Sequence, residues 1–303
     1  MRLVLIGDVH IFRLALPPAS LLSKRILGQT NLWLNRRHRF EHALMKCILD
    51  RIVSLDPNML LLTGDLTTTA LEQEFQDIGR LLEPLTGRFH TIAVPGNHDR
   101  YTFTSARVGR MERMLPGLVP PRFPDFRKLT DHWSLLALDG AVPRLLNARG
   151  RLGARQLHRA HRHVRRLSAD EGLIVLCHYP LKTPPRVPPA TWDHKLAESG
   201  RLRRILRHCP ARILYVHGHI HRPWCWQPRR PRHGRITYIN AGSPCLTSTR
   251  HPQGQGFWQI DLPEDPNDPI GFVHHVPMSD GIGGRSGGVN DVRITDWEAR
   301  EGF

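Results

Sequence analysis

The sequence predicts an α/β fold with a largely parallel or mixed central sheet. Short apolar runs, which have the length of buried strands, alternate with segments in which apolar residues recur at helical spacing. Such alternation is typical of βαβ units, whose crossover helices pack on the faces of a sheet. Toward the C-terminus, further strand-like runs follow one another without helical segments between them. This indicates a second sheet packed on the first, and we expect one layered domain rather than two separate ones.

The predicted strands are runs of apolar and β-branched residues bounded by turn residues. Those that lie between helical segments are expected to run parallel, because a crossover helix returns the chain to the same end of the sheet. The predicted strands cover Arg2–Ile6, Met59–Thr63, Phe89–Val94, Trp133–Leu138, Leu173–Cys177, Ala211–Val216, Arg235–Ile239, Phe257–Asp261 and Gly271–Val276.

Two amphipathic segments predict crossover helices between the first strands. In the first segment, Leu44, Ile48 and Ile52 recur at a spacing of four residues. The second segment precedes the strand that ends at Gly96, and its apolar residues are Leu71, Phe75, Ile78, Leu82 and Leu85.

Three segments depart from this alternation. Residues 11–40 form a basic amphipathic insert that includes Arg36–Arg39. This insert suits a cap over a site, a helical excursion packed on its own domain, or a helix on a membrane surface. The proline-rich residues 180–193 predict a stiff loop, and the glycine-rich residues 277–303 predict a flexible tail. The predicted domain therefore spans residues 1–276.

The charge balance indicates an anionic partner. The chain of 303 residues has 43 Lys and Arg against 27 Asp and Glu, which gives a formal net charge of +16. A phosphorylated substrate, an acidic membrane surface or a nucleic acid would each use this excess. Solvated helix faces are the simpler explanation of any single basic cluster, whereas a negatively charged partner is the simplest use for the total.

Cysteine usage and hydropathy favour a cytoplasmic protein. The five cysteines are scattered without C-x-x-C spacing, so neither a disulfide framework nor a thiolate zinc site is predicted. No apolar run approaches the roughly 18 residues that a membrane span requires. We expect the protein to be free in the cytoplasm or peripheral on the inner membrane surface.

Four predicted strands end in glycine followed directly by a potential metal ligand. Because parallel strands end at the same edge of a sheet, these polar side chains are expected to gather there. Carboxylate, imidazole and amide ligands without thiolate favour Mn, Fe or Zn, and so many ligands predict a polynuclear centre and a metal-dependent hydrolase. We expect the glycines to make the turns that let neighbouring ligands converge. The segments are Gly7-Asp8-Val9-His10, Gly64-Asp65, Gly96-Asn97-His98-Asp99 and Gly218-His219-Ile220-His221.

These motifs, with the lone His178 between the third and the fourth, resemble the signature of the calcineurin-like metallophosphoesterase superfamily. The order D-x-H, G-D, G-N-H-[DE], His, G-H-x-H is the one that this superfamily shows, and the form here is most similar to its bacterial phosphodiesterase-like branch. The resemblance runs from Gly7 to His221. It implies a four-layer α/β/β/α sandwich of two mixed sheets, with a dinuclear metal site at the carboxyl ends of the strands.

Carried over residue by residue, the resemblance also implies roles. His98 would stabilise the transition state or protonate the leaving oxygen, and Asp99 would hydrogen-bond His98 and fix its orientation. A hydroxide bridging two divalent ions (Mn, Fe or Zn) would attack phosphorus in line. One ion would be held by Asp8, His10, Asp65 and His221, and the other by the bridging Asp65 with Asn97, His178 and His219.

The resemblance implies hydrolysis of a phosphodiester or pyrophosphate bond in a small phosphorylated substrate. A lipid-linked substrate such as UDP-diacylglucosamine would suit a basic insert that contacts an anionic membrane. A cyclic nucleotide or another nucleotide would suit the second and third motifs. Nucleic acid is disfavoured because the chain lacks strands that interleave aromatic and basic residues. A non-catalytic scaffold of the same fold is disfavoured because every expected ligand type is present.

Overall fold

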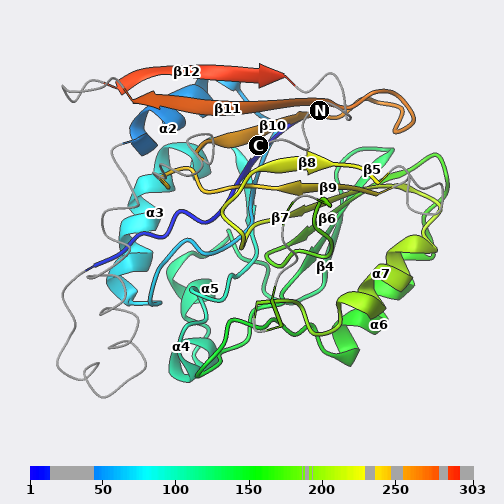
Figure 1. The fold of residues 1–303 in the computed structure, drawn as a ribbon, viewed down its shortest axis with the longest axis horizontal. Coiled ribbons are helices and arrows are strands. Elements are labelled where there is room, and N and C mark those ends of the chain that lie inside the picture. Colours follow the sequence, from blue (N-terminus) through cyan, green and yellow to red (C-terminus); the bar gives the residue numbers. More distant parts are fainter. Residues whose placement is uncertain are drawn as a thin grey trace.

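Two six-stranded mixed sheets pack face to face, and helices cover the outer face of each sheet (Figure 1). No helix in the part of the chain that is described could cross a membrane, because none is both long and apolar enough. The predicted insert 11–40 lies outside this part from residue 14 onward. The computed structural model describes residues 1–13, 44–185, 187, 191–192, 194–228, 236–246, 255–279 and 286–293.

The first sheet has the strand order β12-β11-β10-β1-β2-β3. Its strands β1, β2 and β3 are parallel, and β10, β11 and β12 continue the sheet in antiparallel fashion from the other side of β1. Helices α2 and α3 make the crossovers from β1 to β2 and from β2 to β3. The elements are β1 (Arg2–Ile6), α2 (Leu44–Leu55), β2 (Met59–Leu62), α3 (Glu72–Thr86), β3 (His90–Ala93), β10 (Phe257–Asp261), β11 (Gly271–Ser279) and β12 (Ser286–Arg293).

The second sheet has the order β4-β5-β6-β7-β9-β8. Strands β5, β6, β7 and β9 are parallel, and the short strands β4 and β8 pair antiparallel at the two edges. Helices α6 and α7 connect β5 to β6 and β6 to β7, and the short helices α4 (Phe103–Arg107) and α5 (Arg110–Met114) join the two halves. The other elements are β4 (Asp125–Lys128), β5 (Trp133–Leu138), α6 (Ala154–Val164), β6 (Gly172–Cys177), α7 (Ser199–Arg207), β7 (Arg212–His217), β8 (Trp224–Trp226) and β9 (Ile236–Asn240).

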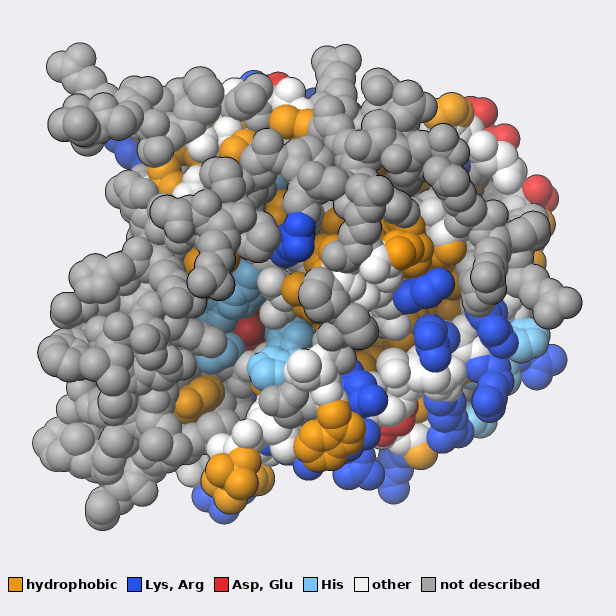
Figure 2. Space-filling view, viewed as in Figure 1, with side chains coloured by type: hydrophobic (Ala, Val, Ile, Leu, Met, Phe, Trp, Pro, Cys, Tyr) orange, Lys and Arg blue, Asp and Glu red, His pale blue; other side chains and the backbone are white. Residues whose placement is uncertain are grey.

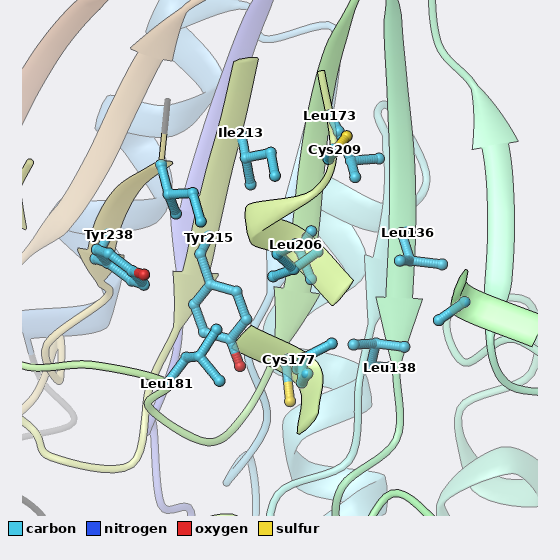
Figure 3. Close-up of a cluster of buried hydrophobic side chains, with 14 of the residues drawn as sticks. Leu136, Leu138, Leu173, Cys177, Leu181, Leu206, Cys209, Ile213, Tyr215 and Tyr238 are labelled. Carbon is cyan, nitrogen blue, oxygen red and sulfur yellow. The ribbon is translucent and has the colours of Figure 1, made fainter. Parts of the chain in front are cut away.

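The hydrophobic core has three layers that follow from the alternation of side chains along each strand. In β1, Val4 and Ile6 face α2 and α3, whereas Leu3 and Leu5 belong to the layer between the two sheets. The third layer lies between the second sheet and its helices, where Leu136, Leu206 and Tyr215 meet (Figure 3). This arrangement confirms the predicted four-layer α/β/β/α sandwich.

Three strands were not predicted from the sequence, and all lie at or near sheet edges. Strands β4 and β8 have four and three residues, too few for a clear periodicity. Strand β12 lies within residues 277–303, which we predicted to be a flexible tail. Pairing with β11 accounts for this strand despite its glycines, and Arg51 on α2 binds Asp291 with an Nη2–Oδ2 distance of 2.5 Å. The tail is therefore strand over these residues, and its boundary at residue 277 stays a prediction.

Candidate metal centre

The carboxyl ends of five parallel strands deliver the predicted ligands to one place between the sheets. Strands β1, β2 and β3 are followed by ligands from the first sheet, and β6 and β7 by ligands from the second. Histidine side chains surround an acidic side chain in a hollow on this face of the molecule (Figure 2). The residues are Asp8 and His10 after β1, Asp65 after β2, Asn97 after β3, His178 after β6, and His219 and His221 after β7.

The first group of candidate ligands consists of Asp8, His10, Asp65 and His221, whose ligand atoms all lie within 4.8 Å of one another. The two imidazoles face each other with 2.9 Å between Nε2 of His10 and Nε2 of His221. Asp8 Oδ1 lies 3.3 Å from His221 Nε2, and Asp65 Oδ2 lies 3.8 Å from His10 Nε2. Two carboxylates and two imidazoles thus converge on one small volume.

The second group consists of Asp65, His178 and His219, again with ligand atoms within 4.8 Å of one another. His178 Nε2 lies 3.3 Å from Asp65 Oδ2, 3.1 Å from His219 Nδ1 and 3.2 Å from the amide oxygen of Asn97. Asp65 belongs to both groups, which is the arrangement that a bridging carboxylate requires. The structure therefore brings all seven predicted ligands together.

The candidate ligands themselves occupy unusual backbone conformations. Residues with a Cβ rarely adopt positive φ, which costs on the order of 1–3 kcal/mol each. Backbone hydrogen bonds oppose this strain, because the amide of Asp8 donates to Gly64 O at 2.9 Å and that of His10 donates to Asp65 O at 3.0 Å. Positive φ angles occur at Asp8 (55°), His10 (53°), Asp65 (51°), His219 (74°) and His221 (57°).

This finding corrects the role that we expected for the glycines. Of the four motif glycines, Gly64 alone has a positive φ, at 92°. Gly96 and Gly218 are required for space instead. A Cβ on Gly96 would meet Asp65 Oδ1 at 2.1 Å, and one on Gly218 would meet Asp8 Oδ2 at 2.3 Å. These glycines let the backbone pass directly behind the carboxylates.

The outward nitrogen of two rings is held by a backbone carbonyl. His178 Nδ1 lies 2.8 Å from Thr63 O, and His219 Nε2 lies 2.9 Å from His194 O. A carbonyl only accepts, so these nitrogens carry the protons and the opposite nitrogen of each ring is directed into the centre. Such backbone contacts are the usual support of metal-binding imidazoles. The donor set and its orientation therefore fit divalent ions.

The electrostatics of the centre also suit cations. Burial would raise the pKa of Asp65, but the positive charge of His178 and His98 holds that pKa well below its usual range. Burial would lower the pKa of His178, yet Asp65 and Asp8 raise it to about 9. Burial raises the pKa of Asp8. A proton on His178 therefore marks a place of negative potential, and a bound cation displaces such protons.

His98 and Asp99 lie beside this centre but do not interact as we expected. His98 Nδ1 lies 2.6 Å from Thr68 O, and the His98 ring stacks on Tyr101 with 5.7 Å between centroids. Asp99 accepts instead from the amides of Gly96 and Thr67, at 3.0 and 2.9 Å, and from Thr67 Oγ1 at 3.0 Å. The Thr68 carbonyl thus orients His98, and Asp99 ties the loop after β3 to the loop after β2. Burial, helped by the charge of Asp65, raises the pKa of Asp99 to about 6.

Several residues around the centre were missed because they act through the backbone or from a neighbouring position. The carbonyls of Thr63, Thr68 and His194 leave no mark in the sequence, since any residue has a carbonyl. Ser243 Oγ donates to Asp8 O at 2.6 Å, and Asn240 Nδ2 donates to Gly218 O at 3.0 Å. These two residues lie at and after the end of β9, which is not among the strand ends whose motifs predicted ligands.

Comparison with known proteins agrees with this geometry. Residues 1–223 match the model of the calcineurin-like phosphoesterase family. A 3′,5′-cyclic adenosine monophosphate phosphodiesterase, CpdA, from Vibrio vulnificus is 26% identical over 250 residues, which cover 81% of this chain and 77% of the relative.

Two solved structures show the same fold at low sequence identity. A dimetal phosphatase from Danio rerio is similar with a TM-score of 0.58 and 15% identity, over 97% of this chain and 98% of that one. A purple acid phosphatase from yellow lupin has a TM-score of 0.60 and 11% identity, over 96% of this chain and 53% of that one.

Proposed function

This chain belongs to the calcineurin-like phosphoesterase family and is a hydrolase of phosphoester bonds, and from this premise we propose that its substrate is a 3′,5′-cyclic nucleotide. The convergence of two ligand groups on Asp65 is the observation that carries the reaction. The Vibrio vulnificus relative, named as a cyclic AMP phosphodiesterase, supports the substrate class.

The buried carboxylates and imidazoles fit two divalent ions. Asp8, His10, Asp65 and His221 would hold one ion, and Asp65, Asn97, His178 and His219 would hold the other. When bound, such ions make water nucleophilic near neutral pH and neutralise charge on phosphoryl oxygens. Mn, Fe and Zn all accept this donor set, which has no thiolate among its members.

His98 is the residue that we assign to the leaving oxygen. Its backbone amide donates to Asp65 Oδ1 at 2.8 Å, and its ring lies edge-on to that of His10 with 4.8 Å between centroids. Because Thr68 O engages Nδ1, a proton given to the leaving oxygen would come from Nε2 of the doubly protonated ring. A positioned imidazole of this kind contributes about 10²–10⁴-fold to the rate. Tyr101 supports the ring by stacking, and Asp99 holds the loop that carries it.

The lipid-linked substrate stays a prediction. It depends on the insert 11–40, most of which lies outside the described residues, and the same holds for contact with an anionic membrane. The cyclic nucleotide is favoured because the relative supports it independently of that insert.

The proposal is tested with metal-stripped protein to which Mn, Fe, Zn or Co is added back. We expect metal-dependent hydrolysis of both bis-p-nitrophenyl phosphate and 3′,5′-cyclic AMP. His98→Ala is expected to lower kcat by about 10²-fold or more, whereas His208→Ala, an exposed histidine after α7, serves as the control and leaves kcat unchanged. If the protein hydrolyses bis-p-nitrophenyl phosphate but not 3′,5′-cyclic AMP, the proposed substrate class is rejected, whereas the metal-dependent phosphodiester hydrolysis is supported. Absence of turnover with every metal, despite bound metal, would favour a non-catalytic scaffold.

A further inference from the structure

A second concave site lies on the outer face of the second sheet, beside α7. Its cavity volume is about 320 Å³, and its lining residues include none of the candidate metal ligands. Tyr238 of β9 belongs to the core layer between this sheet and its helices (Figure 3), so the pocket opens away from the interface between the sheets. Lys and Arg side chains gather on the part of the surface formed by α6 and α7 (Figure 2). The pocket is lined by Lys182, Gly200, Arg203, Arg204, Arg207 and Tyr238.

Helical spacing explains how α7 lines the pocket. Leu202 and Leu206 are buried against the sheet, and Gly200, Arg203, Arg204 and Arg207 share the neighbouring face at spacings of three and four residues. Like charges at this spacing destabilise a helix by about 0.2–0.5 kcal/mol per pair. In the described part of the chain, no carboxylate forms an ion pair with any of these three arginines.

The helix dipole accounts for only part of this charge. Arg204 and Arg207 lie in the last turn of α7, where a cation interacts favourably with the helix terminus. Arg203 lies before that turn, and Lys182 comes from the segment after β6. A dipole effect therefore does not explain why four cations line one cavity.

A stacked aromatic pair contacts one of these cations and contributes one of the lining residues. Lys182 Nζ lies 5.0 Å from the ring centroid of Trp226, which stacks on Tyr238 with 5.7 Å between centroids and an angle of 27°. Burial raises the pKa of Tyr238 to about 12, although the positive charges of Arg203 and Arg207 lower that pKa. Arg203, Arg207 and Tyr238 line the same cavity, and a tyrosine hydroxyl with this pKa stays protonated and able to donate at neutral pH.

We propose that this pocket binds an anion with two or more linked phosphate groups, at a site separate from the metal centre. Guanidinium groups bind phosphate oxygens in bidentate fashion, and several converging cations match a polyanion better than a single charge. A cavity of this size is at the lower end of the range for small-molecule sites. Trp226 is only 8% exposed and offers no open face to a base, so the phosphate chain is the part recognised.

An anion in this pocket would contact two parts of the connection between β6 and β7, namely Lys182 near its start and the arginines of α7 near its end. Lys182 follows His178 by four residues, and α7 closes the connection from β6. The same connection includes His194, whose carbonyl contacts His219. Occupation of the pocket would therefore restrain a connection that follows one candidate ligand, His178, and contacts another, His219.

The proposal is tested by calorimetric titration of the metal-stripped protein with tripolyphosphate near physiological salt. We expect stoichiometric binding that weakens at least tenfold in the double variant Arg203→Gln/Arg207→Gln. The charge-matched control is Arg162→Gln/Arg166→Gln on and just after α6, which removes the same charge outside the pocket and should change affinity less than twofold. Equal weakening in both doubles would overturn the proposal, as would failure of tripolyphosphate to bind.

Gly200 gives a second test that does not remove any arginine. A Cβ built on Gly200 meets no atom within 4 Å, and an acidic side chain in the first turn suits the helix dipole. Gly200→Glu should therefore fold and abolish binding by placing a carboxylate among the arginines, whereas Gly200→Gln should bind at least tenfold more tightly than Gly200→Glu. Equal affinities of these two variants would contradict the electrostatic basis of the site.

A further titration identifies the source of the phosphates. Equal affinities for ATP and tripolyphosphate would show that the phosphate chain alone is recognised. Tighter binding of ATP would place a nucleotide in the same pocket, provided that Arg203→Gln/Arg207→Gln weakens it as well. If Arg203→Gln/Arg207→Gln leaves the affinity for ATP unchanged, ATP binds elsewhere and the pocket is not a nucleotide site.

Discussion

Two groups of buried histidines in this protein have the same residue type and similar burial but different surroundings. His10 and His178 of the metal centre are 1% and 0% exposed, and His275 and His274 of β11 are 1% and 6% exposed. His275 Nδ1 lies 2.6 Å from Asp291 Oδ1, and its Nε2 lies 3.0 Å from Gln259 Oε1. Its ring also stacks on Phe257 with 4.7 Å between centroids. A buried histidine beside a carboxylate is therefore not sufficient evidence of a metal site.

The backbone makes the difference between the two groups. His274 and His275 are neighbours within a regular strand, so their side chains point to opposite faces of the sheet. The ligands of the metal centre come after strand ends, and positive φ angles turn Asp8 and His10, and likewise His219 and His221, toward the same point. Convergence at strand ends, rather than burial, distinguishes the metal centre.

The largest expected effect is that of Asp65→Ala, which removes the one residue common to both ligand groups. We expect loss of bound metal and a fall in kcat/KM of at least about 10³-fold, which corresponds to about 4 kcal/mol of transition-state stabilisation. Metal content by mass spectrometry and kcat/KM are measured together. The control is Asp291→Ala, which removes the carboxylate of the other histidine group. Equal metal content in the two variants would contradict the comparison.

Gly218→Ala should have a smaller effect on the same centre. The added methyl group would meet Asp8 Oδ2 at 2.3 Å, so the carboxylate must move. We expect metal affinity to fall about 10–100-fold, as for other disturbances of groups that position a ligand. Gly79→Ala on α3, where a Cβ meets Leu115 Cδ2 at 3.4 Å, is the matched control. Unchanged metal affinity in Gly218→Ala would show that the space behind Asp8 is not needed.

His274 should make the protein sensitive to acid independently of the metal centre. Burial, with help from the neighbouring His275, lowers the pKa of His274 to about 3, whereas the unfolded chain titrates near 6.5. The unfolded state therefore binds more protons between these values, and stability is lost as pH falls below about 6.5. At pH 5 the loss is about 2 kcal/mol.

His274→Phe should remove this part of the pH dependence. Denaturant unfolding of both proteins in metal-stripped form, at pH 7 and pH 5, gives the difference directly. The phenylalanine can keep the packing against Trp258, whose ring centroid lies 4.6 Å from that of His274. If both proteins lose the same stability between the two pH values, His274 is not the group responsible.

The smallest expected effect is that of Asp291→Asn, which weakens the attachment of β12. Asp291 accepts from His275 and from Arg51, but it is partly exposed, so we expect a loss of about 0.5–1 kcal/mol. Amide exchange in β12 should accelerate while exchange in β1 and β2 stays the same. Uniform acceleration across the first sheet would show that β12 supports the whole sheet.

The central part of the fold could be predicted because its strands carry unambiguous signals. Runs such as Leu3–Ile6 and Ile213–Val216 are apolar on both faces, which is what a sheet covered on both sides requires. Edge strands such as β8 are short and pair with one neighbour, so their sequence is under weaker constraint. Strand β12 depends on β11 and α2 rather than on its own composition.

The candidate ligands could be predicted from their places after strand ends, but their supports could not. The positive φ angles of His10 and His221 cannot be deduced from their residue type, because the neighbouring loops impose them. The carbonyl of Thr68 orients His98 from a position that any side chain could occupy. Asp99 was assigned to His98 by analogy, whereas its place beside the amides of Gly96 and Thr67 follows from how the two loops meet.

The apolar layer between the sheets sets a dimension of the metal centre. Asp8 and Asp65 are attached to one sheet, and His178 and His219 to the other, so side chains such as Leu5 and Leu176 separate the two sets of ligands. The volume of this layer sets the distance between the two sheets. Because the ligands come directly after strand ends, this distance also affects how far apart the ligands of the two sheets lie. A change of side-chain volume there alters the distance between the ligands of the two sheets, whereas the same change under α2 or α7 alters packing on the outer faces. The packing of the core between the sheets therefore contributes to the separation of the candidate ligands.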